Sequence, residues 1–477
     1  MLNKLFKEGG LYTLASFLTK GISLILIPFY TNYFSTADYG VISMLGLFGA
    51  FSGAIVSLQV FRGMARIIAE ENTSKYEQKV IGSTTFYFTC ILFITFAVIG
   101  YTKRSFFIDI LSSDVRIEEQ TYLLALTVIC VNFLFHTLGV QLKFLRKVKQ
   151  FALISFLHSI FNIILIIFFA LKLDLGINSI YIASLVISPI IILTQLIILK
   201  NYIGLHFDFK RLKQMLKFSL PLIPTGIIYL LLNFTDRLFI KEMLSMSDVG
   251  IYDLAFKFSA IISIVLYEFQ SALAPVLYQN HKKLKTKVEL VKIFNAFFGL
   301  GSLGVLILSL FSSETLLVFT NSAYYDAKDL MPIFYLTVLV SGLGMFSPGI
   351  FIKNKTKITP YIVAISAVIN LSINYVMIKN FGLLGAALST FISMLINNVI
   401  LFIISQRYYK VPLRLKLIYK MLAYLTISII VGSYIIYSFK LHLAIFITIK
   451  VCFILIYAFA LYKNKLLNIK QFLKKDL

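Results

Sequence analysis

Long apolar runs, separated by short polar segments, follow one another along almost the whole chain of 477 residues. A run of about 20 apolar residues is long enough for a helix to cross the ~30 Å hydrocarbon core of a membrane. The pattern predicts an all-α integral membrane protein of about fourteen transmembrane helices, and an even number puts both termini on one side. The predicted spans cover residues 10–34, 39–62, 80–101, 119–141, 150–171, 177–199, 217–240, 250–275, 292–312, 329–352, 358–378, 383–405, 417–438 and 442–462.

The composition agrees with this pattern. Hydrophobic residues make up 59% of the chain and charged residues only 14%, and the mean hydropathy is +0.88. Soluble domains carry about 25% charged residues, and a soluble core of this size could not hide so much apolar surface. These values exclude a soluble enzyme.

The net charge of +24 raises the question of a nucleic-acid partner, and the positions of the charges answer it. If both termini are cytoplasmic, the loops and tails on that side hold 33 Lys and Arg residues and the opposite loops hold 8. Such a bias is the positive-inside rule of membrane proteins. The basic loops then face anionic lipid headgroups, so we expect membrane lipids and no nucleic acid as partners, with both termini cytoplasmic.

The predicted loops are short, and this bears on the possible function. The longest outer loop, about residues 102–118, is too small for the external catalytic domain of a membrane glycosyltransferase or polymerase. The three cysteines and five histidines are scattered, without the spacing that a metal site or disulfide framework needs. We therefore expect neither an enzyme nor a bound cofactor or metal.

An internal repeat divides the chain. The segment Ser35-Thr-Ala-Asp38-Tyr-Gly40 recurs as Ser245-Met-Ser-Asp248-Val-Gly250, at an offset of 210 residues. A second similarity between the two halves aligns Asn162 with Asn370 at an offset of 208. Parallel repeats of six helices predict two lobes around a pseudo-two-fold axis along the membrane normal, with a cavity between them. The predicted domains are residues 1–205 and 206–412, each a six-helix lobe, and 413–477, two extra helices with a basic cytoplasmic tail.

The residues around the repeated segment resemble a known family, the Wzx-type polysaccharide flippases of the multidrug/oligosaccharidyl-lipid/polysaccharide exporter superfamily. The resemblance covers roughly residues 5–410 and does not separate flippases for O-antigen from those for capsule or teichuronic-type repeat units. The motifs that carry it are Thr19-Lys20-Gly21-Ile22, Pro28, Asp38-Tyr39-Gly40, Pro221-Leu-Ile-Pro224, Asn233-Phe-Thr-Asp236-Arg237, Asp248-Val-Gly250-Ile-Tyr252 and Pro275.

The resemblance implies a multi-pass protein of the bacterial cytoplasmic (inner) membrane that works by alternating access. Its substrate would be an undecaprenyl-diphosphate-linked oligosaccharide repeat unit, moved from the inner to the outer leaflet for surface polysaccharide biosynthesis. A polysaccharide polymerase machinery would be a further partner.

Charged residues inside predicted spans are candidates for function, because each costs about 2.5–3.5 kcal/mol or more in the membrane. Asp253, Lys257 and Glu268 project from one ~60° face of their predicted helix. Asp253 and Lys257 form a possible acid–base pair four residues apart. Asp253 and Glu268 are candidates for binding a coupling proton or ion.

The cations in the spans suit a diphosphate, whose negative charges Lys and Arg attract strongly at low dielectric. We expect Lys20, Arg62, Arg237 and Lys257 to bind the diphosphate in the cavity. The alternatives are that Arg237 simply extends to the outer interface and that Arg62 anchors the cytoplasmic end of its span. Lys450, in the last span, is a candidate for a groove that holds the lipid tail. Lipid II flippases also carry basic residues on helices 1, 2 and 8.

Three other functions stay open at this point. A lipid II flippase would share the fold and the basic cavity. A cation-coupled multidrug exporter should carry more acidic than basic residues in its spans, whereas basic ones are in excess here. An integral-membrane glycosyltransferase or polymerase would need a catalytic loop.

Overall fold

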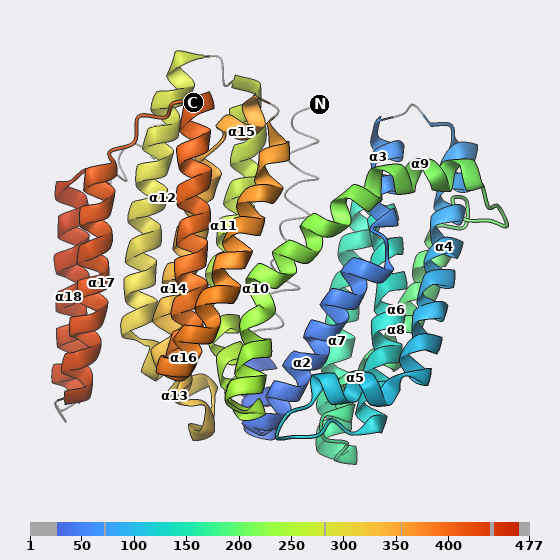
Figure 1. The fold of residues 1–477 in the computed structure, drawn as a ribbon, viewed down its shortest axis with the longest axis horizontal. Coiled ribbons are helices and arrows are strands. Elements are labelled where there is room, and N and C mark those ends of the chain that lie inside the picture. Colours follow the sequence, from blue (N-terminus) through green and yellow to red (C-terminus); the bar gives the residue numbers. More distant parts are fainter. Residues whose placement is uncertain (1–25, 71–72, 281–282, 354, 439–442, 467–477) are drawn as a thin grey trace. The chain divides into compact units, whose positions relative to one another are not determined.

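Helices supply all the regular structure of the described residues in the computed structural model, which covers 26–70, 73–280, 283–353, 355–438 and 443–466 (Figure 1). Ten helical segments in this part of the chain are long and apolar enough to cross a membrane. The predicted all-α membrane fold is therefore confirmed, while the number of fourteen spans stays a prediction. The first predicted span lies mostly outside the described residues.

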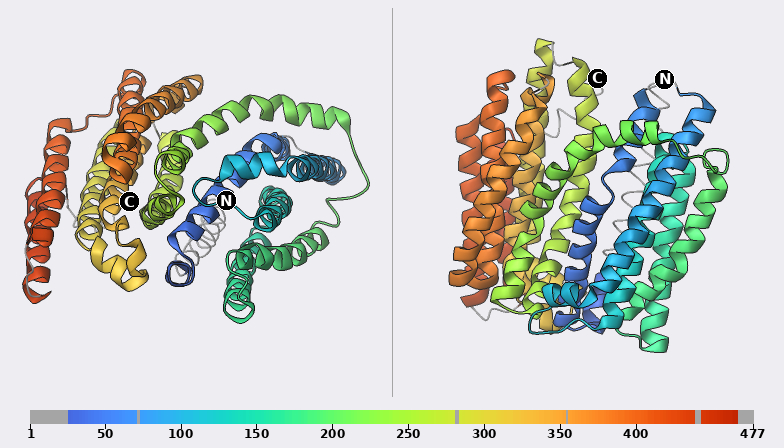
Figure 2. Two further views of the ribbon diagram at one scale, coloured as in Figure 1. Left: turned by 60° about the horizontal axis from the view of Figure 1, so that its bottom comes forward. Right: turned by 45° about the vertical axis from the view of Figure 1, so that its right-hand side comes forward.

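The chain divides into two compact units, Met1–Asp253 and Leu254–Leu477, and we describe each by itself. The lobe boundaries at residues 205 and 412 remain predictions. In unit 1, five long helices form most of a bundle, α2, α4, α6, α7 and α8 (Figure 2). Its helices are α2 (Thr36–Val56), α3 (Val60–Glu70), α4 (Lys75–Thr102), α5 (Arg104–Leu111), α6 (Glu119–Phe144), α7 (Val148–Leu173), α8 (Asn178–Ile198), α9 (Phe209–Ser219), η1 (Leu220–Leu222), α10 (Ile223–Met243) and the start of α11 (Met246–Asn280).

Unit 2 continues α11 and contains one helix of 50 residues, α16, in which the chain reverses direction at Gly382. Gly382 has φ 55° and ψ −134°, a conformation open to glycine alone, so α16 is two helices joined by a kink. The two predicted spans 358–378 and 383–405 lie on either side of it. The helices of unit 2 are α12 (Leu284–Leu310), α13 (Ser312–Phe319), η2 (Ser322–Tyr324), α14 (Ala327–Leu343), η3 (Gly344–Phe346), α15 (Gly349–Ile352), η4 (Thr356–Ile358), α16 (Thr359–Tyr408), α17 (Leu415–Ser438) and α18 (Leu443–Lys463).

The repeated sequence motif has the same local structure in both of its copies. The Asp38 amide donates to Ser35 Oγ at 3.1 Å, and the Asp248 amide donates to Ser245 Oγ at 3.1 Å. Each serine thus caps the first turn of a helix, α2 in one copy and α11 in the other, with an acidic residue in that turn.

The second predicted span is interrupted, which corrects the prediction of one helix over 39–62. The helix α2 ends at Val56, and Leu58 and Gln59 have φ 46° and 52°, in the left-handed region that a continuous helix cannot contain. After this break the chain continues as α3. The apolar side of α3 packs against α9, and the buried residues of this contact are Val60, Met64, Ile67, Ile68, Leu212 and Met215.

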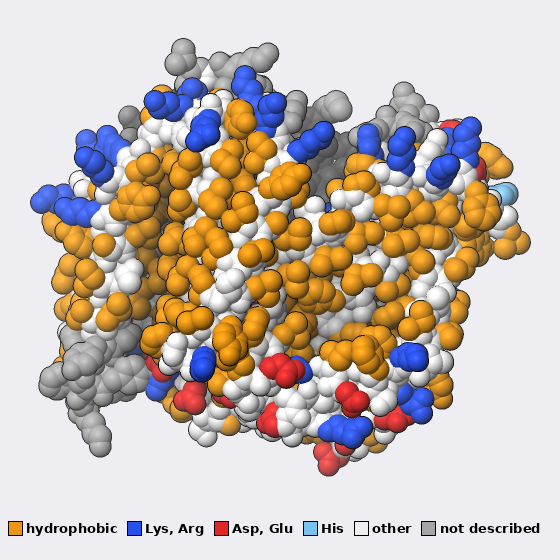
Figure 3. Space-filling model, in the orientation of Figure 1, with side chains coloured by type: hydrophobic (Ala, Val, Ile, Leu, Met, Phe, Trp, Pro, Cys, Tyr) orange, Lys and Arg blue, Asp and Glu red, His pale blue; other side chains and the backbone are white. Residues whose placement is uncertain are grey.

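Charged side chains separate along unit 1. Figure 3 shows Lys and Arg gathered over α9 and the nearby end of α4, while Asp and Glu, mixed with several Lys and Arg, lie at the opposite end, around α5. This separation agrees with the positive-inside rule if the α9 end is cytoplasmic.

Candidate functional site

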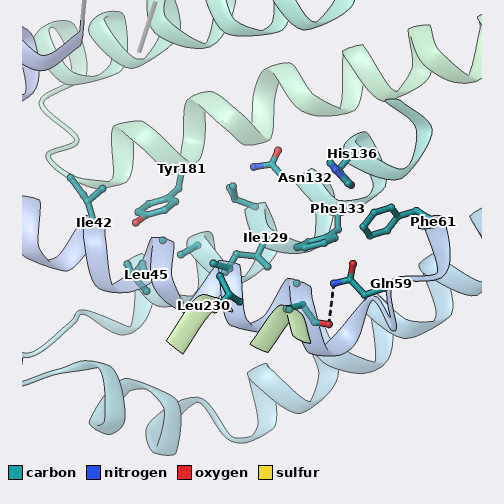
Figure 4. A pocket seen from close by; sticks show the side chains of 18 of the residues that line it. Ile42, Leu45, Gln59, Phe61, Ile129, Asn132, Phe133, His136, Tyr181 and Leu230 are labelled. Carbon is teal, nitrogen blue, oxygen red and sulfur yellow. Dashed lines mark hydrogen bonds between the residues drawn. The ribbon is translucent and has the colours of Figure 1, made fainter. Parts of the chain in front are cut away.

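A cavity of about 660 Å³ opens within unit 1, beside the break between α2 and α3. Its walls come from α2, α6, α8 and α10, and from the first turn of α3. Figure 4 shows Gln59, Phe61 and His136 at one end and Ile42 and Tyr181 at the other. The volume lies in the range of small-molecule sites, about 300–1,000 Å³.

Glycines keep the cavity open. Gly46 of α2 has no neighbouring atom within 4 Å of the position that a Cβ would take, and across the cavity a Cβ on Gly226 of α10 would meet only Gln59 Nε2, at 3.9 Å. A Cβ on Gly53 would instead lie 1.8 Å from the ring of Phe133. Gly53 thus lets this ring lie against α2, Gly46 faces open space, and a side chain at Gly226 would reach Gln59.

Polar side chains project among the apolar walls, and besides His136 and Tyr181 they include Gln59, Asn132 and Arg62. Gln59 is only 7% exposed, and its Oε1 atom has no hydrogen-bond partner among the described residues. Asn132 Oδ1 accepts a hydrogen bond from Ser188 Oγ at 3.2 Å. Arg62 is exposed and lines the cavity three residues after Gln59. The site can therefore offer an acceptor, an amide and a positive charge to a ligand.

Arg237 of α10 is buried in an ion-pair network. The sequence had left two other roles open for it, a cation that binds the diphosphate in the cavity and a side chain that extends to the outer interface. Its side chain is 2% exposed. Its Nε and Nη2 donate to Asp253 Oδ1 at 3.0 and 2.8 Å, and Nη1 lies 3.4 Å from Asp236 Oδ1. The Tyr252 hydroxyl donates to the other oxygen of Asp236. Two carboxylates thus balance the charge of Arg237, and it does not extend to the interface.

This network also changes the interpretation of Asp253. The sequence suggested Lys257, one turn away on the same helix, as its partner. The structure gives Asp253 two hydrogen bonds from Arg237, which lies 16 residues earlier on another helix. Lys257 is partly buried in the part of α11 that belongs to unit 2.

Lys450 of α18 is completely buried in unit 2, where the sequence suggested a groove for the lipid tail. Its ammonium group pairs with the carboxylate of Glu314 on α13 and lies 4.8 Å from the ring centre of Phe311. The partner lies 136 residues away in the chain, so spacing could not reveal it. An ion pair inside the unit replaces the proposed groove contact.

Two further candidates cannot be placed. Lys20 lies outside the described residues, and so does the side chain of Glu268. Of the predicted diphosphate ligands, Arg62 is the one that the structure places at the cavity of unit 1.

Sequence reasoning missed several residues. Gln59, Asn132 and Tyr181 line the cavity without any charge or motif to mark them. Lys241, assigned to an outer loop, is 3% exposed and donates to the carbonyl oxygens of Ile110 and Ser112 at 2.8 and 2.9 Å. It thereby ties the end of α5 to α10. No sequence signal marked this contact.

Comparison with solved structures identifies the fold. The lipid II flippase MurJ in an inward closed conformation superposes with a TM-score of 0.72, at 17% identity, over 95% of this chain and 99% of that one. An inward-facing multidrug resistance MATE family transporter of the MOP superfamily has a TM-score of 0.64, at 15% identity, over 83% and 94%.

Sequence relatives agree with this fold. A Shigella flexneri protein provisionally named an O-antigen transporter is 22% identical over 80% of this chain and 93% of its own length. A Haloferax volcanii protein named a probable low-salt glycan biosynthesis flippase, Agl15, is 22% identical over 49% of each chain. Residues 221–376 match the MatE family, and residues 5–281, more than half of the chain, match the family described as Polysaccharide biosynthesis protein. The chain therefore belongs to the polysaccharide biosynthesis protein family, and it is of the Wzx flippase type that its motifs resemble.

Proposed function

We propose that this protein moves an undecaprenyl-diphosphate-linked oligosaccharide from the inner to the outer leaflet of the bacterial cytoplasmic membrane by alternating access. Both termini would be cytoplasmic, and the product would serve surface polysaccharide biosynthesis. The observation that supports this most is the cavity of unit 1, in a fold shared with MurJ. Its apolar walls, amide groups and Arg62 suit an amphiphile that carries both sugars and negative charge.

The positive charges have separate roles in this proposal. Arg62 stands at the cavity, and Lys20 and Lys257 remain proposed ligands of the diphosphate. Arg237 holds α10 against α11 through Asp253, so its charge is not available to the substrate unless the network opens. Coupling through Asp253 or Glu268 stays part of the proposal, and for Asp253 it would require release from Arg237.

Transport can be measured directly in liposomes. The purified protein is reconstituted with a fluorescent undecaprenyl-diphosphoryl saccharide, and the label that reaches the outer leaflet is quenched from outside. We expect transport with wild-type protein, a loss in the Lys20→Ala, Lys257→Ala double variant, and retention of most activity in Lys20→Arg. Liposomes without protein are the control.

The same assay separates the alternatives. Equal or faster transport of lipid II would favour a lipid II flippase, whose fold this chain shares. Uptake of cationic dyes driven by a sodium or proton gradient, without glycan-lipid transport, would favour a multidrug exporter, in keeping with the match of residues 221–376 to MatE. Transfer of sugar between lipid carriers would indicate an enzyme.

A further inference from the structure

We propose that the Gln59 end of the cavity in unit 1 binds the sugar ring attached directly to the diphosphate, and so selects among lipid-linked saccharides. This inference rests on the proposed function and adds a specificity site to it. It requires that the cavity suit a neutral, hydroxylated ring, and that the diphosphate lie within reach of a nearby cation.

The hydrogen-bonding groups are the first argument. Gln59 Oε1 is a buried acceptor without a partner, and such a group costs free energy unless a ligand or water satisfies it. The other end of the amide holds the side chain in place, because Nε2 donates to the Ala54 carbonyl oxygen at 3.5 Å (Figure 4). A sugar hydroxyl that donates to Oε1 would satisfy it.

Asn132 supplies the complementary group. Ser188 Oγ donates to its Oδ1 at 3.2 Å, so the amide NH₂ is the part of this side chain that can donate to a ligand. Sugar hydroxyls both donate and accept, and a cavity with one acceptor and one donor matches them. A purely apolar occupant, such as the isoprenoid chain, would offer no hydrogen bond to Gln59 Oε1 or to the Asn132 NH₂ group.

The shape of the cavity is the second argument. A Cβ on Gly226 would just contact Gln59 Nε2, at 3.9 Å, and Tyr229, one turn later on α10, is 57% exposed although it lies in an apolar helix. The face of an aromatic ring carries negative charge and attracts the weakly positive C–H groups of an apolar surface. A sugar ring presents such C–H groups on one side and hydroxyls at its edge. Tyr229 is therefore suited to stack on the ring while Gln59 binds its edge.

The position of Arg62 is the third argument. It follows Gln59 by three residues, and its backbone amide donates to the Gln59 carbonyl at 2.8 Å. The two side chains thus start within a single turn of the chain. A phosphate at Arg62 would place the sugar bonded to it beside Gln59.

The test compares four ligands that differ only in the sugar. The purified full-length protein in nanodiscs is titrated with undecaprenyl diphosphate and with undecaprenyl-diphosphoryl N-acetylglucosamine, glucose and galactose. We expect at least one of the sugars to raise the affinity by about tenfold, the effect of one or two good hydrogen bonds. Gln59→Met and Gly226→Leu should abolish this gain and leave the affinity for undecaprenyl diphosphate within about twofold.

Two variants serve as controls. Gly304→Leu makes the same glycine-to-leucine change in α12, where a Cβ meets no atom within 4 Å. It should change neither the affinity for undecaprenyl diphosphate nor the gain from the sugar. Arg62→Ala should weaken binding of all the ligands by a similar factor, because all of them carry the diphosphate.

Each result leads to a distinct conclusion. If the wild-type protein transports glycan lipids but binds all four ligands equally, the sugar site is wrong and the proposed function stands. If Gln59→Met and Gly226→Leu leave the sugar gain intact, the ring binds elsewhere and the proposal is overturned. If the two variants weaken binding of the ligands with and without a sugar alike, the cavity binds the diphosphate or the isoprenoid chain instead. If the wild-type protein binds none of the ligands and transports none, the proposed function itself is wrong.

Discussion

Gly40 and Gly250 lie against each other's helices in a reciprocal contact. A Cβ on Gly40 would come within 2.0 Å of the Met246 carbonyl oxygen, and a Cβ on Gly250 within 2.0 Å of the Thr36 carbonyl oxygen. The offset of 210 residues that relates the glycines also relates Thr36 to Met246. The starts of α2 and α11 therefore cross about a local two-fold axis, where only glycine leaves room for the opposite backbone.

This crossing predicts the effect of adding one methyl group. Gly40→Ala and Gly250→Ala should each destabilise the protein by about 1–3 kcal/mol, because neither backbone can move away without disturbing its helix. We expect a similar loss for both, since the contacts are equivalent. Thermal unfolding in detergent measures it, with Gly46→Ala as the control, because a methyl group there meets nothing within 4 Å. Unchanged unfolding temperatures in both variants would contradict the close crossing.

The Arg237 network predicts a large cost for removing one member. Arg237→Met removes the guanidinium group that pairs with the buried carboxylates of Asp236 and Asp253, which should cost about 3–5 kcal/mol. Adding Asp253→Asn to this variant should recover part of the loss, because one uncompensated charge disappears. Unfolding of the two single variants and the double variant forms the cycle. Strictly additive losses would show that the two side chains do not interact.

The Lys450 pair predicts a loss of protein rather than of transport. Lys450→Met removes the cation that pairs with the partly buried Glu314 carboxylate and should lower the amount of folded protein, with similar transport per folded molecule. Lys285→Met is the matched control, because its pair with Glu289 is exposed and contributes little. Normal folding with a specific transport defect would instead restore the lipid-tail interpretation of Lys450.

The proposed topology predicts where reporters lie. A reporter fused after Asp114 or Asp326 should lie outside the cell, and one fused after Lys283 or Arg407 should lie in the cytoplasm, because the basic loops are expected to stay inside. Alkaline phosphatase and green fluorescent protein fusions measure this. A cytoplasmic signal at Asp326 would be incompatible with two parallel six-helix repeats.

The contact between Asp114 and α11 predicts a pH dependence. Hydrogen bonds from the Ser113 hydroxyl and the Met246 amide lower the pKa of the Asp114 carboxyl below its usual value. A lowered pKa stabilises the fold above the unfolded pKa of about 3.9, and this contribution is lost as the pH falls through the folded pKa. Asp114→Asn should therefore lower the unfolding temperature at pH 7.

The same variant provides its own test at low pH. The difference in unfolding temperature between Asp114→Asn and the wild type should shrink as the pH falls below about 4. Asp109→Asn should have little effect, because Asp109 faces Arg116 at 3.7 Å on the exposed surface. An Asp114→Asn difference that stays constant from pH 7 to pH 3 would rule out a role for the ionised carboxylate.

The sequence predicted the helices well because apolar length is a strong local signal. It also identified the repeat, since Ser35 and Ser245 cap equivalent helices. It could not predict the break at Leu58 and Gln59, because neither residue type is typical of the left-handed conformation.

The partners of the buried charges were beyond sequence analysis for a different reason. Arg237 and Asp253 lie on different helices, and so do Lys450 and Glu314. Which helices become neighbours depends on packing across the whole unit, and helical periodicity gives only the face of each helix. The cavity was missed because neutral amides such as Gln59 are common, and burial alone makes this one unusual.

The pairing of α3 with α9 also has a consequence for how the chain is made. The apolar side of α3, with Val60 and Met64, packs on Leu212 and Met215, about 150 residues later in the chain. Bacterial and other ribosomes add about 5–20 residues per second, so α9 emerges roughly 8–30 s after α3. During this time α4 and α6 can already pack on α3, but its side toward Leu212 and Met215 has no partner. The lipid interface is the natural place for such an exposed apolar side of an amphipathic helix. The order of synthesis therefore leaves this side of α3 to the membrane interface until α9 arrives.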